Sequence, residues 1–61
     1  SASGADMVHY FMEEQEIKQS DLPEIGPQNV VAEVLCGKRE LNVRQIRALA
    51  CRFHVSPAVF I

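Results

Sequence analysis

Apolar residues recur at intervals of three and four along most of this 61-residue chain, which is the spacing of one buried helix face. Five short helices joined by tight turns account for the pattern, and no segment alternates over the length of a strand, so the predicted fold class is all-α. The first helix begins at Asp6, whose carboxylate can accept backbone N–H groups. Three glutamates oppose the helix dipole at its other end, so we expect fraying near Gln15. Its apolar stripe consists of Met7, Val8, Phe11 and Met12.

Proline and glycine mark the limits of the next two predicted helices. The second helix starts near Gln19 or Ser20 and ends at Gly26, which we expect in the left-handed conformation. Pro27 opens the third helix, where a missing N–H is tolerated, and Gly37 closes it. The core positions of these two helices are Leu22, Ile25, Val31, Val34 and Leu35.

Two capping residues begin the last two predicted helices. Asn42 is placed to cap the fourth helix, and Ser56 followed by Pro57 begins a short fifth helix. The apolar positions on these helices are Val43, Ile46, Leu49, Ala50, Phe53, Val59, Phe60 and Ile61. A chain this short forms one small domain at most.

Composition places the chain among globular domains, because apolar residues make up 48% of it and a disordered tail has far fewer. Residues 1–5 are interpreted as a disordered cloning scar or linker remnant, and residues 6–61 as the folded domain. We find no signal peptide and no apolar run of membrane length. Two cysteines without disulfide spacing are typical of a reduced, cytosolic protein.

The most informative feature is the pair of helices joined by a short turn at Gly26. Such a unit places its second helix in the major groove of DNA. Residues at the start of that helix reach base edges, so Gln28 and Asn29 are predicted to contact adenine N6 and N7. If Val30 faces outward it can touch a thymine methyl group, and Glu33 can accept a hydrogen bond from cytosine N4.

Phosphate contacts are predicted on both sides of the third helix. The N–H groups at the start of the second helix attract a phosphate, and basic side chains follow the third helix and begin the fourth. The predicted phosphate-contacting residues are Lys18, Gln19, Ser20, Lys38, Arg39 and Arg44. Because the formal net charge is -2, DNA binding requires that these basic residues share a face.

The same residues give the chain a family resemblance. Segments 18–22 and 31–39, together with Gly26, resemble the phage-repressor-type (Cro-like) helix-turn-helix domain, which implies a lambda-repressor-like fold. Within that class the chain is most similar to the C-terminal half of the HigA antitoxins. The positions that carry this similarity are Ser20–Gly26, Leu41, Ala48–Ala50, Arg52–Phe53 and Ser56–Ile61.

The resemblance implies a repressor of its own toxin–antitoxin operon that binds a palindromic double-stranded DNA operator as a homodimer in the bacterial cytoplasm. It also implies a HigB-like, mRNA-cleaving toxin as partner, bound largely through a region outside this chain. The turn between the second and third helices is shorter than in phage repressors. The residues that read bases can therefore be shifted by one position along the third helix. Two further departures are Glu33, where a polar or basic residue is common, and Cys36, where Asn or Ser is common.

Metal binding and catalysis have little support in the sequence. Cys51 and His54 lie three positions apart, and His9 and Cys36 are two further candidate zinc ligands. The four residues do not have the paired-ligand spacing of a zinc site. A helical domain of this size also leaves little room for a substrate cleft, so we predict no enzyme, no catalytic residue, no metal and no cofactor. A protein-interaction module of the same fold without DNA binding stays open, because the chain is acidic and Glu33 repels phosphate.

Overall fold

The computed structural model describes residues 4–61, and within them it contains only helices. The prediction of an all-α fold is therefore confirmed for this range, although the second and fifth helices are short 3₁₀ helices. In chain order the elements are α1 (Gly4–Gln15), η1 (Gln19–Asp21), α2 (Gln28–Leu35), α3 (Val43–Phe53) and η2 (Pro57–Phe60). In residues 4–61 no helix has the length and apolar character that crossing a membrane requires.

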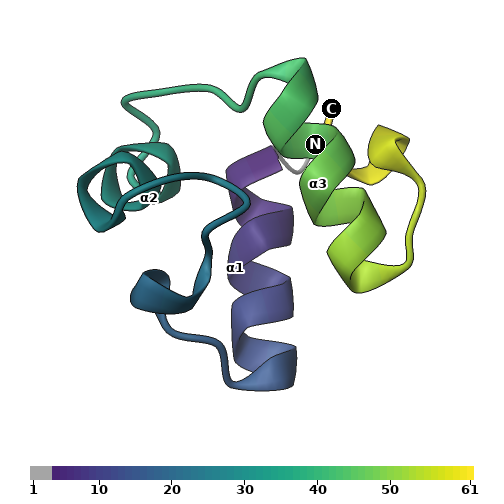
Figure 1. Ribbon diagram of the computed structural model, residues 1–61, viewed down its shortest axis with the longest axis horizontal. Coiled ribbons are helices and arrows are strands. Elements are labelled where there is room, and N and C mark those ends of the chain that lie inside the picture. The colour runs from purple at the N-terminus through teal and green to yellow at the C-terminus, as the bar shows by residue number, and fades with distance from the viewer. Residues whose placement is uncertain (1–3) are drawn as a thin grey trace.

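One apolar core holds the helices together. Figure 1 shows α1 in the centre of the molecule, with α2 on one side and α3 on the other. Phe11 of α1 stacks on Phe53 of α3 with ring centroids 4.4 Å apart. Burying each large side chain contributes about 1.5–3 kcal/mol, so a domain of this size depends on every one of them. The buried apolar residues are Val8, Leu22, Ile25, Val31, Val34, Leu49, Ala50, Phe53 and Phe60.

The first helix starts earlier than its predicted boundary. Gly4 and Ala5 lie in the first turn of α1, although the sequence assigned them to a disordered remnant, and residues 1–3 of that remnant lie outside the described residues. Asp6 therefore occupies the first turn instead of the cap position. Its carboxylate still lies at the positive end of the helix dipole.

Both ends of α1 are set by backbone geometry. A β-carbon at Gly4 would collide with the carbonyl oxygen of Phe60, so glycine allows the start of α1 to pack directly on η2. At the other end the helix stops at Gln15, where the sequence predicted fraying. Glu16 then adopts a left-handed φ of 54° and turns the chain away.

The second helix is much shorter than predicted. Only Gln19–Asp21 forms a 3₁₀ turn, and Leu22 leaves helical geometry with φ −119° and ψ 61°. Pro23 explains the break, because its ring disfavours helical geometry in the preceding residue. A tight turn replaces the lost helix, and the amides of Ile25 and Gly26 both donate to the carbonyl of Leu22, at 3.1 and 3.4 Å. Gly26 has φ 144°, which is positive as expected but outside the left-handed helical region.

The predicted stop and start signals around α3 are confirmed. Gly37 has φ 85° and ends the turn that follows α2. Asn42 caps α3, since its side chain accepts from the amide of Gln45 at 2.8 Å. The hydroxyl of Ser56 accepts from the amide of Ala58 at 3.2 Å and begins η2.

Gln45 is the one buried polar side chain among residues 4–61, with 6% of its surface exposed. Its side-chain oxygen accepts from the amide of Asn42 and completes a reciprocal capping box. Its side-chain nitrogen donates to the carbonyl of Ile25, also at 2.8 Å. One side chain therefore joins the start of α3 to the turn that leads into α2.

Replacing Gln45 with methionine should lower the free energy of unfolding by about 1–3 kcal/mol, because the Ile25 carbonyl would be left buried without its donor. Urea unfolding followed by circular dichroism measures this change. Arg47→Met is the matched control, since Arg47 lies on the same helix but is exposed, and it should change stability by about 0.5 kcal/mol or less. Equal effects of the two substitutions would contradict the assigned role of Gln45.

Candidate nucleic-acid interface

One face of α2 is open to solvent and the other is in the core. Val31 and Val34 are buried, and Val30 is half-buried against the same core and lies beside Gly26. The outer face consists of Gln28, Asn29, Ala32, Glu33 and Cys36, all of them exposed or half-exposed. These positions follow helical spacing, which puts them on one side of the helix.

The outer face differs from the predicted base-reading set at three positions. Val30 was expected to contact a base only if it faced outward, and it packs against the core instead. Ala32 and Cys36 lie on the outer face but were not predicted as contacts. Their spacing of four and eight residues from Gln28 was a signal that could have identified them.

The first turn of α2 points polar groups out of the protein. Pro27, predicted to open the helix, is its N-cap, and the helix itself starts at Gln28. The first intrahelical hydrogen bonds run from Val30 and Val31 to the Pro27 carbonyl, at 2.9 and 3.1 Å. The preceding amides, of Gln28 and Asn29, therefore have no acceptor within the helix, and both side chains are exposed beside them.

The predicted phosphate-contacting residues lie on both sides of α2. Figure 1 shows α2 between η1 on one side and the connection to α3 on the other. Lys18 and Ser20 are exposed at η1, whereas Gln19 is half-buried. Lys38 is exposed in the connection and Arg44 is exposed at the start of α3. The two groups therefore flank the outer face from opposite sides.

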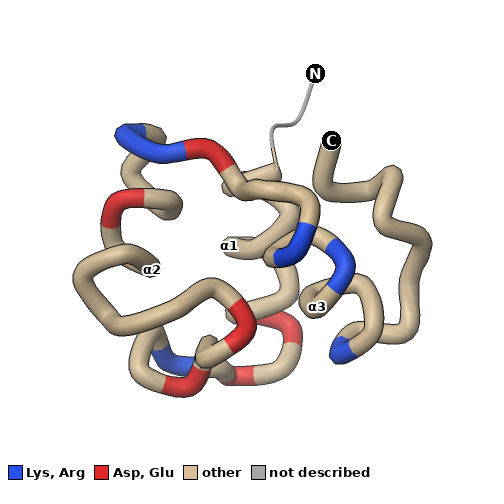
Figure 2. Tube along the Cα trace, turned by 45° about the horizontal axis from the view of Figure 1, so that its top comes forward, with Lys and Arg blue, Asp and Glu red and all other residues tan. Residues whose placement is uncertain are grey.

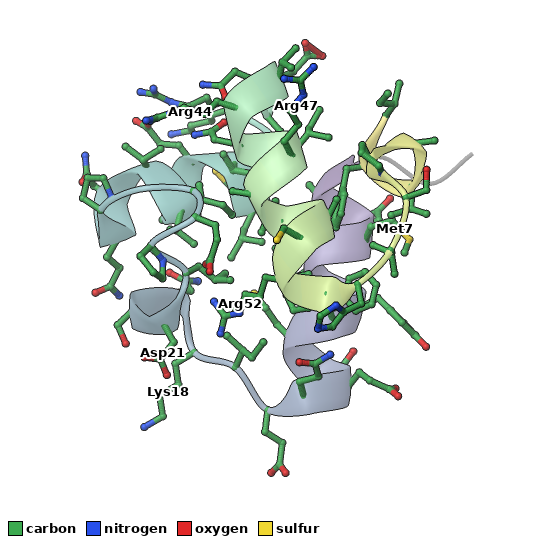
Figure 3. The ribbon with its side chains drawn as sticks, turned by 45° about the vertical axis from the view of Figure 1, so that its right-hand side comes forward. Met7, Lys18, Asp21, Arg44, Arg47 and Arg52 are labelled. Atoms are coloured by element: carbon green, nitrogen blue, oxygen red, sulfur yellow. The ribbon has the colours of Figure 1, made fainter. Side chains whose placement is uncertain are left out.

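The group at η1 is weaker than predicted. A phosphate was expected at the N-terminus of a second helix, but a three-residue 3₁₀ turn has only a small dipole. Lys18 extends beside Asp21, as Figure 3 shows, so its field is partly offset by a carboxylate. The exposed side chains of Lys18 and Ser20 are the main donors left on this flank.

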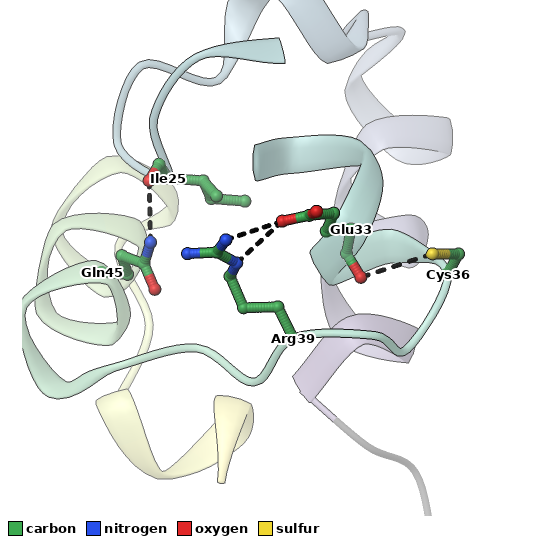
Figure 4. A network of polar contacts seen from close by, with 5 residues as sticks. All are labelled: Ile25, Glu33, Cys36, Arg39 and Gln45. Atoms are coloured by element: carbon green, nitrogen blue, oxygen red, sulfur yellow. Dashed lines mark hydrogen bonds and ion pairs between the residues drawn. The ribbon is translucent and has the colours of Figure 1, made fainter. Parts of the chain in front are cut away.

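Arg39 is paired with Glu33. Its Nη2 lies 2.7 Å and its Nε 3.0 Å from the same Glu33 oxygen, and Figure 4 shows the pair over the end of α2. The two side chains are 53% and 42% exposed, so the pair is open to solvent. One residue predicted to contact phosphate and one predicted to contact a base are thus in contact with each other.

Arg52 holds η1 and the following turn against α3. Its Nη1 donates to the backbone carbonyl of Asp21 at 2.5 Å and to a carboxylate oxygen of Glu24 at 2.7 Å. Its guanidinium carbon also lies 5.6 Å from the centre of the Phe53 ring. Sequence reasoning missed this role because the partners are about 30 residues apart and share no local pattern.

Arg47 is a second basic residue on α3 that the sequence analysis did not single out. Arg44 and Arg47 are both exposed and lie one turn apart. Figure 3 shows Arg44 nearer to α2 and Arg47 farther from it, both at the same end of α3. Arg44 is therefore much better placed than Arg47 to act together with α2.

Part of the negative charge lies away from the outer face of α2. Figure 2 shows the basic segment that follows α2 at one edge of the molecule and the acidic end of α1 at the opposite edge. Glu13, Glu14 and Glu16 are all exposed at that acidic end. Glu33 on α2 and Glu40 after the basic segment remain beside the outer face.

The candidate metal ligands do not come together. His9 approaches the carbonyl oxygen of Leu35, 3.2 Å from its Nε2, while Cys36 and Cys51 are exposed on different helices. Among residues 4–61 no three histidine, cysteine or carboxylate side chains are arranged to hold a metal ion.

Replacing Arg52 with methionine should lower stability by roughly 1–2 kcal/mol, because a mostly buried ion pair and a hydrogen bond to the backbone are lost together. A double-mutant cycle with Glu24→Gln, followed by urea unfolding, isolates the pair. Arg44→Met is the exposed control on the same helix and should be near neutral. Strictly additive effects of the Arg52 and Glu24 substitutions would refute the coupling.

Comparison with known proteins shows that the chain is similar to one group of antitoxins. No family model matches it. It is 43% identical over 58 residues to the curated proteins named Antitoxin HigA from Escherichia coli strain K12, Escherichia coli O6:H1 and Shigella flexneri. The matched residues make up 95% of this chain but only 42% of each relative. The match confirms the resemblance to the HigA-type antitoxins that the motifs predict, and it extends over nearly the whole of this chain.

Proposed function

We propose that this chain is the helix-turn-helix DNA-binding part of a HigA-type transcriptional repressor, and that α2 is the helix that enters the major groove. The observation that carries the proposal is the outer face of α2, which presents exposed amide side chains between two groups of residues predicted to contact phosphate. A groove-reading helix needs this arrangement, because base edges lie between two phosphate backbones. In this reading, η1 and its turn take the place of the first helix of a lambda-repressor-like unit.

The base contacts are assigned to the exposed residues of α2. Gln28 and Asn29 each offer a donor and an acceptor, which suits the N6 and N7 groups of adenine. Ala32 is better placed than the half-buried Val30 to touch a thymine methyl group.

The phosphate contacts are assigned to the two flanks. Lys18 and Ser20 act on one strand, and Lys38 and Arg44 on the other. Gln19 contributes less because it is half-buried. Four such contacts give modest affinity, so repression requires two copies on half-sites about 34–36 Å apart. The full-length protein is accordingly proposed to bind a palindromic operator as a homodimer.

The relatives' name extends the proposal to the whole protein. Proteins named Antitoxin HigA are similar to this chain over 42% of their own length. We assign to the full-length protein the repression of its own toxin–antitoxin operon and the neutralisation of a HigB-like, mRNA-cleaving toxin in the bacterial cytoplasm. In this proposal the protein is a regulator and not an enzyme.

An interaction module without DNA binding is the second candidate. It is favoured by one observation, the ion pair that neutralises Arg39 beside the outer face of α2. A titration of the full-length protein with the promoter DNA upstream of its own gene, at two salt concentrations, separates the two functions. Binding that weakens steeply with salt supports the repressor, whereas no binding by a folded full-length protein supports the interaction module.

Replacing Gln28 with alanine should weaken operator binding roughly 5- to 150-fold, which corresponds to the loss of one bidentate base contact. Binding to unrelated DNA should hardly change, since Gln28 carries no charge. Fluorescence anisotropy with both duplexes measures the two affinities. An equal loss of affinity for both duplexes would show that Gln28 does not contact a base.

Replacing Arg44 with alanine should weaken binding to all duplexes and reduce the slope of log affinity against log salt by about 0.9. Arg47→Ala is the matched control, because it removes the same charge one turn along the same helix, at a position farther from α2. Its slope should change by less than half as much. Identical slopes for the two variants would contradict the orientation assigned to α3.

A further inference from the structure

The Arg39–Glu33 pair is built by the backbone as well as by the side chains. The amides of Lys38 and Arg39 both donate to the carbonyl of Glu33, at 2.9 and 3.2 Å. These backbone hydrogen bonds fold the turn after α2 back on the helix and by themselves bring Arg39 beside Glu33. The ion pair at 2.7 Å then fixes the guanidinium over the end of the outer face.

The pair is poorly suited to bind phosphate. A phosphate contact gains most of its energy from neutralising a net positive charge. The Glu33 carboxylate cancels the charge of Arg39 and repels a phosphate that comes close. Lys38, the neighbouring residue, is exposed and has no ion pair within residues 4–61, so it is the better phosphate donor in this turn.

The pair is well suited to read a base edge. Nε and Nη2 of Arg39 both face Glu33, which leaves the edge formed by Nη1 and the outer hydrogen of Nη2 free. Figure 4 shows Nη1 pointing away from Glu33. Two parallel N–H groups on a rigid fork match the O6 and N7 acceptors of guanine, and a carboxylate that fixes the fork lowers the entropy lost on binding.

We infer that Arg39 reads a guanine in the major groove and that Glu33 is the positioning residue that orients it. The inference rests on the proposed function, because it assumes that α2 enters the groove. It changes the predicted roles of both residues, since Arg39 becomes a base contact instead of a phosphate contact. Glu33 acts through Arg39 and does not itself accept from cytosine. Each half-site is then expected to contain a G·C pair beyond the bases read by Gln28 and Asn29.

The test uses the full-length protein and a series of operators in which each G·C pair of the half-site is changed singly to A·T, or its guanine to 7-deazaguanine. Affinities are measured by fluorescence anisotropy for the unsubstituted protein, Arg39→Ala, Arg39→Lys and Glu33→Gln. Lys38→Ala is the matched control, because it removes an adjacent, exposed positive charge. Circular dichroism shows that each variant is folded.

For the unsubstituted protein, one G·C pair should matter strongly, with a loss on the order of 5- to 150-fold on substitution. Arg39→Ala should lose this discrimination at that pair alone. Arg39→Lys should keep only part of it, because a lysine also donates to O6 and N7 but has no rigid fork. Glu33→Gln should weaken discrimination at the same pair while binding to unrelated DNA becomes tighter. Lys38→Ala should weaken binding to every duplex alike.

Uniform weakening by Arg39→Ala on every duplex, with a salt slope reduced as in Lys38→Ala, would make Arg39 a phosphate contact and overturn the inference. Full discrimination by Glu33→Gln would overturn the positioning role of Glu33, since it would show that Arg39 reads the base without the carboxylate. If the unsubstituted protein binds no operator at low salt, the proposed function itself fails. Failure of the proposed function is thus distinguished from failure of the inference on Arg39, because it is seen with the unsubstituted protein alone.

Discussion

The side-chain amide of Gln45 donates to the carbonyl of Ile25 in the interior of the domain and accepts from the amide of Asn42 in a partly buried place. Hydrogen bonds in such a place are strong, and leaving either partner unpaired is costly. Because Ile25 leads into α2 and Asn42 leads into α3, this one side chain fixes the start of one helix relative to the other. Arg52 does the same at the opposite end of α3, where it holds η1 and the turn after it. The placement of α2 between its flanks depends on these two anchors, both of which belong to α3.

Local chemistry made much of the fold predictable from the sequence. The capping residues Asn42 and Ser56 and the glycine stop at Gly37 lie where their side chains and φ angles require. The apolar spacing identified most of the core and therefore the direction of the outer face of α2, although Val43 and Ile61 are exposed. The second helix was predicted too long because it was extended through Pro23 to Gly26. The effect of Pro23 on Leu22, which leaves helical geometry, ends the helix after one turn.

Long-range pairs in the candidate site could not be predicted. Gln45 and Arg52 meet partners 20 and 28 or more residues away, and neither pairing leaves a local pattern. The contact between Glu33 and Arg39 depends on how the turn after α2 folds back, which the sequence indicated only as a glycine stop. Ala32 was overlooked for a different reason, because an alanine carries no polar group and only its position on the outer face gives it a role.

The closure of the fold has a consequence for how the domain assembles. Gly4 in the first helix lies against Phe60 in the last, and the Phe60 side chain reaches the core beside Phe11. The first and last elements of residues 4–61 thus meet where the core is completed. Closing such a long loop costs entropy that only the finished core offsets. The domain should therefore assemble in a single cooperative step, with no stable partial fold that keeps α2 in place before the last aromatic residue has docked.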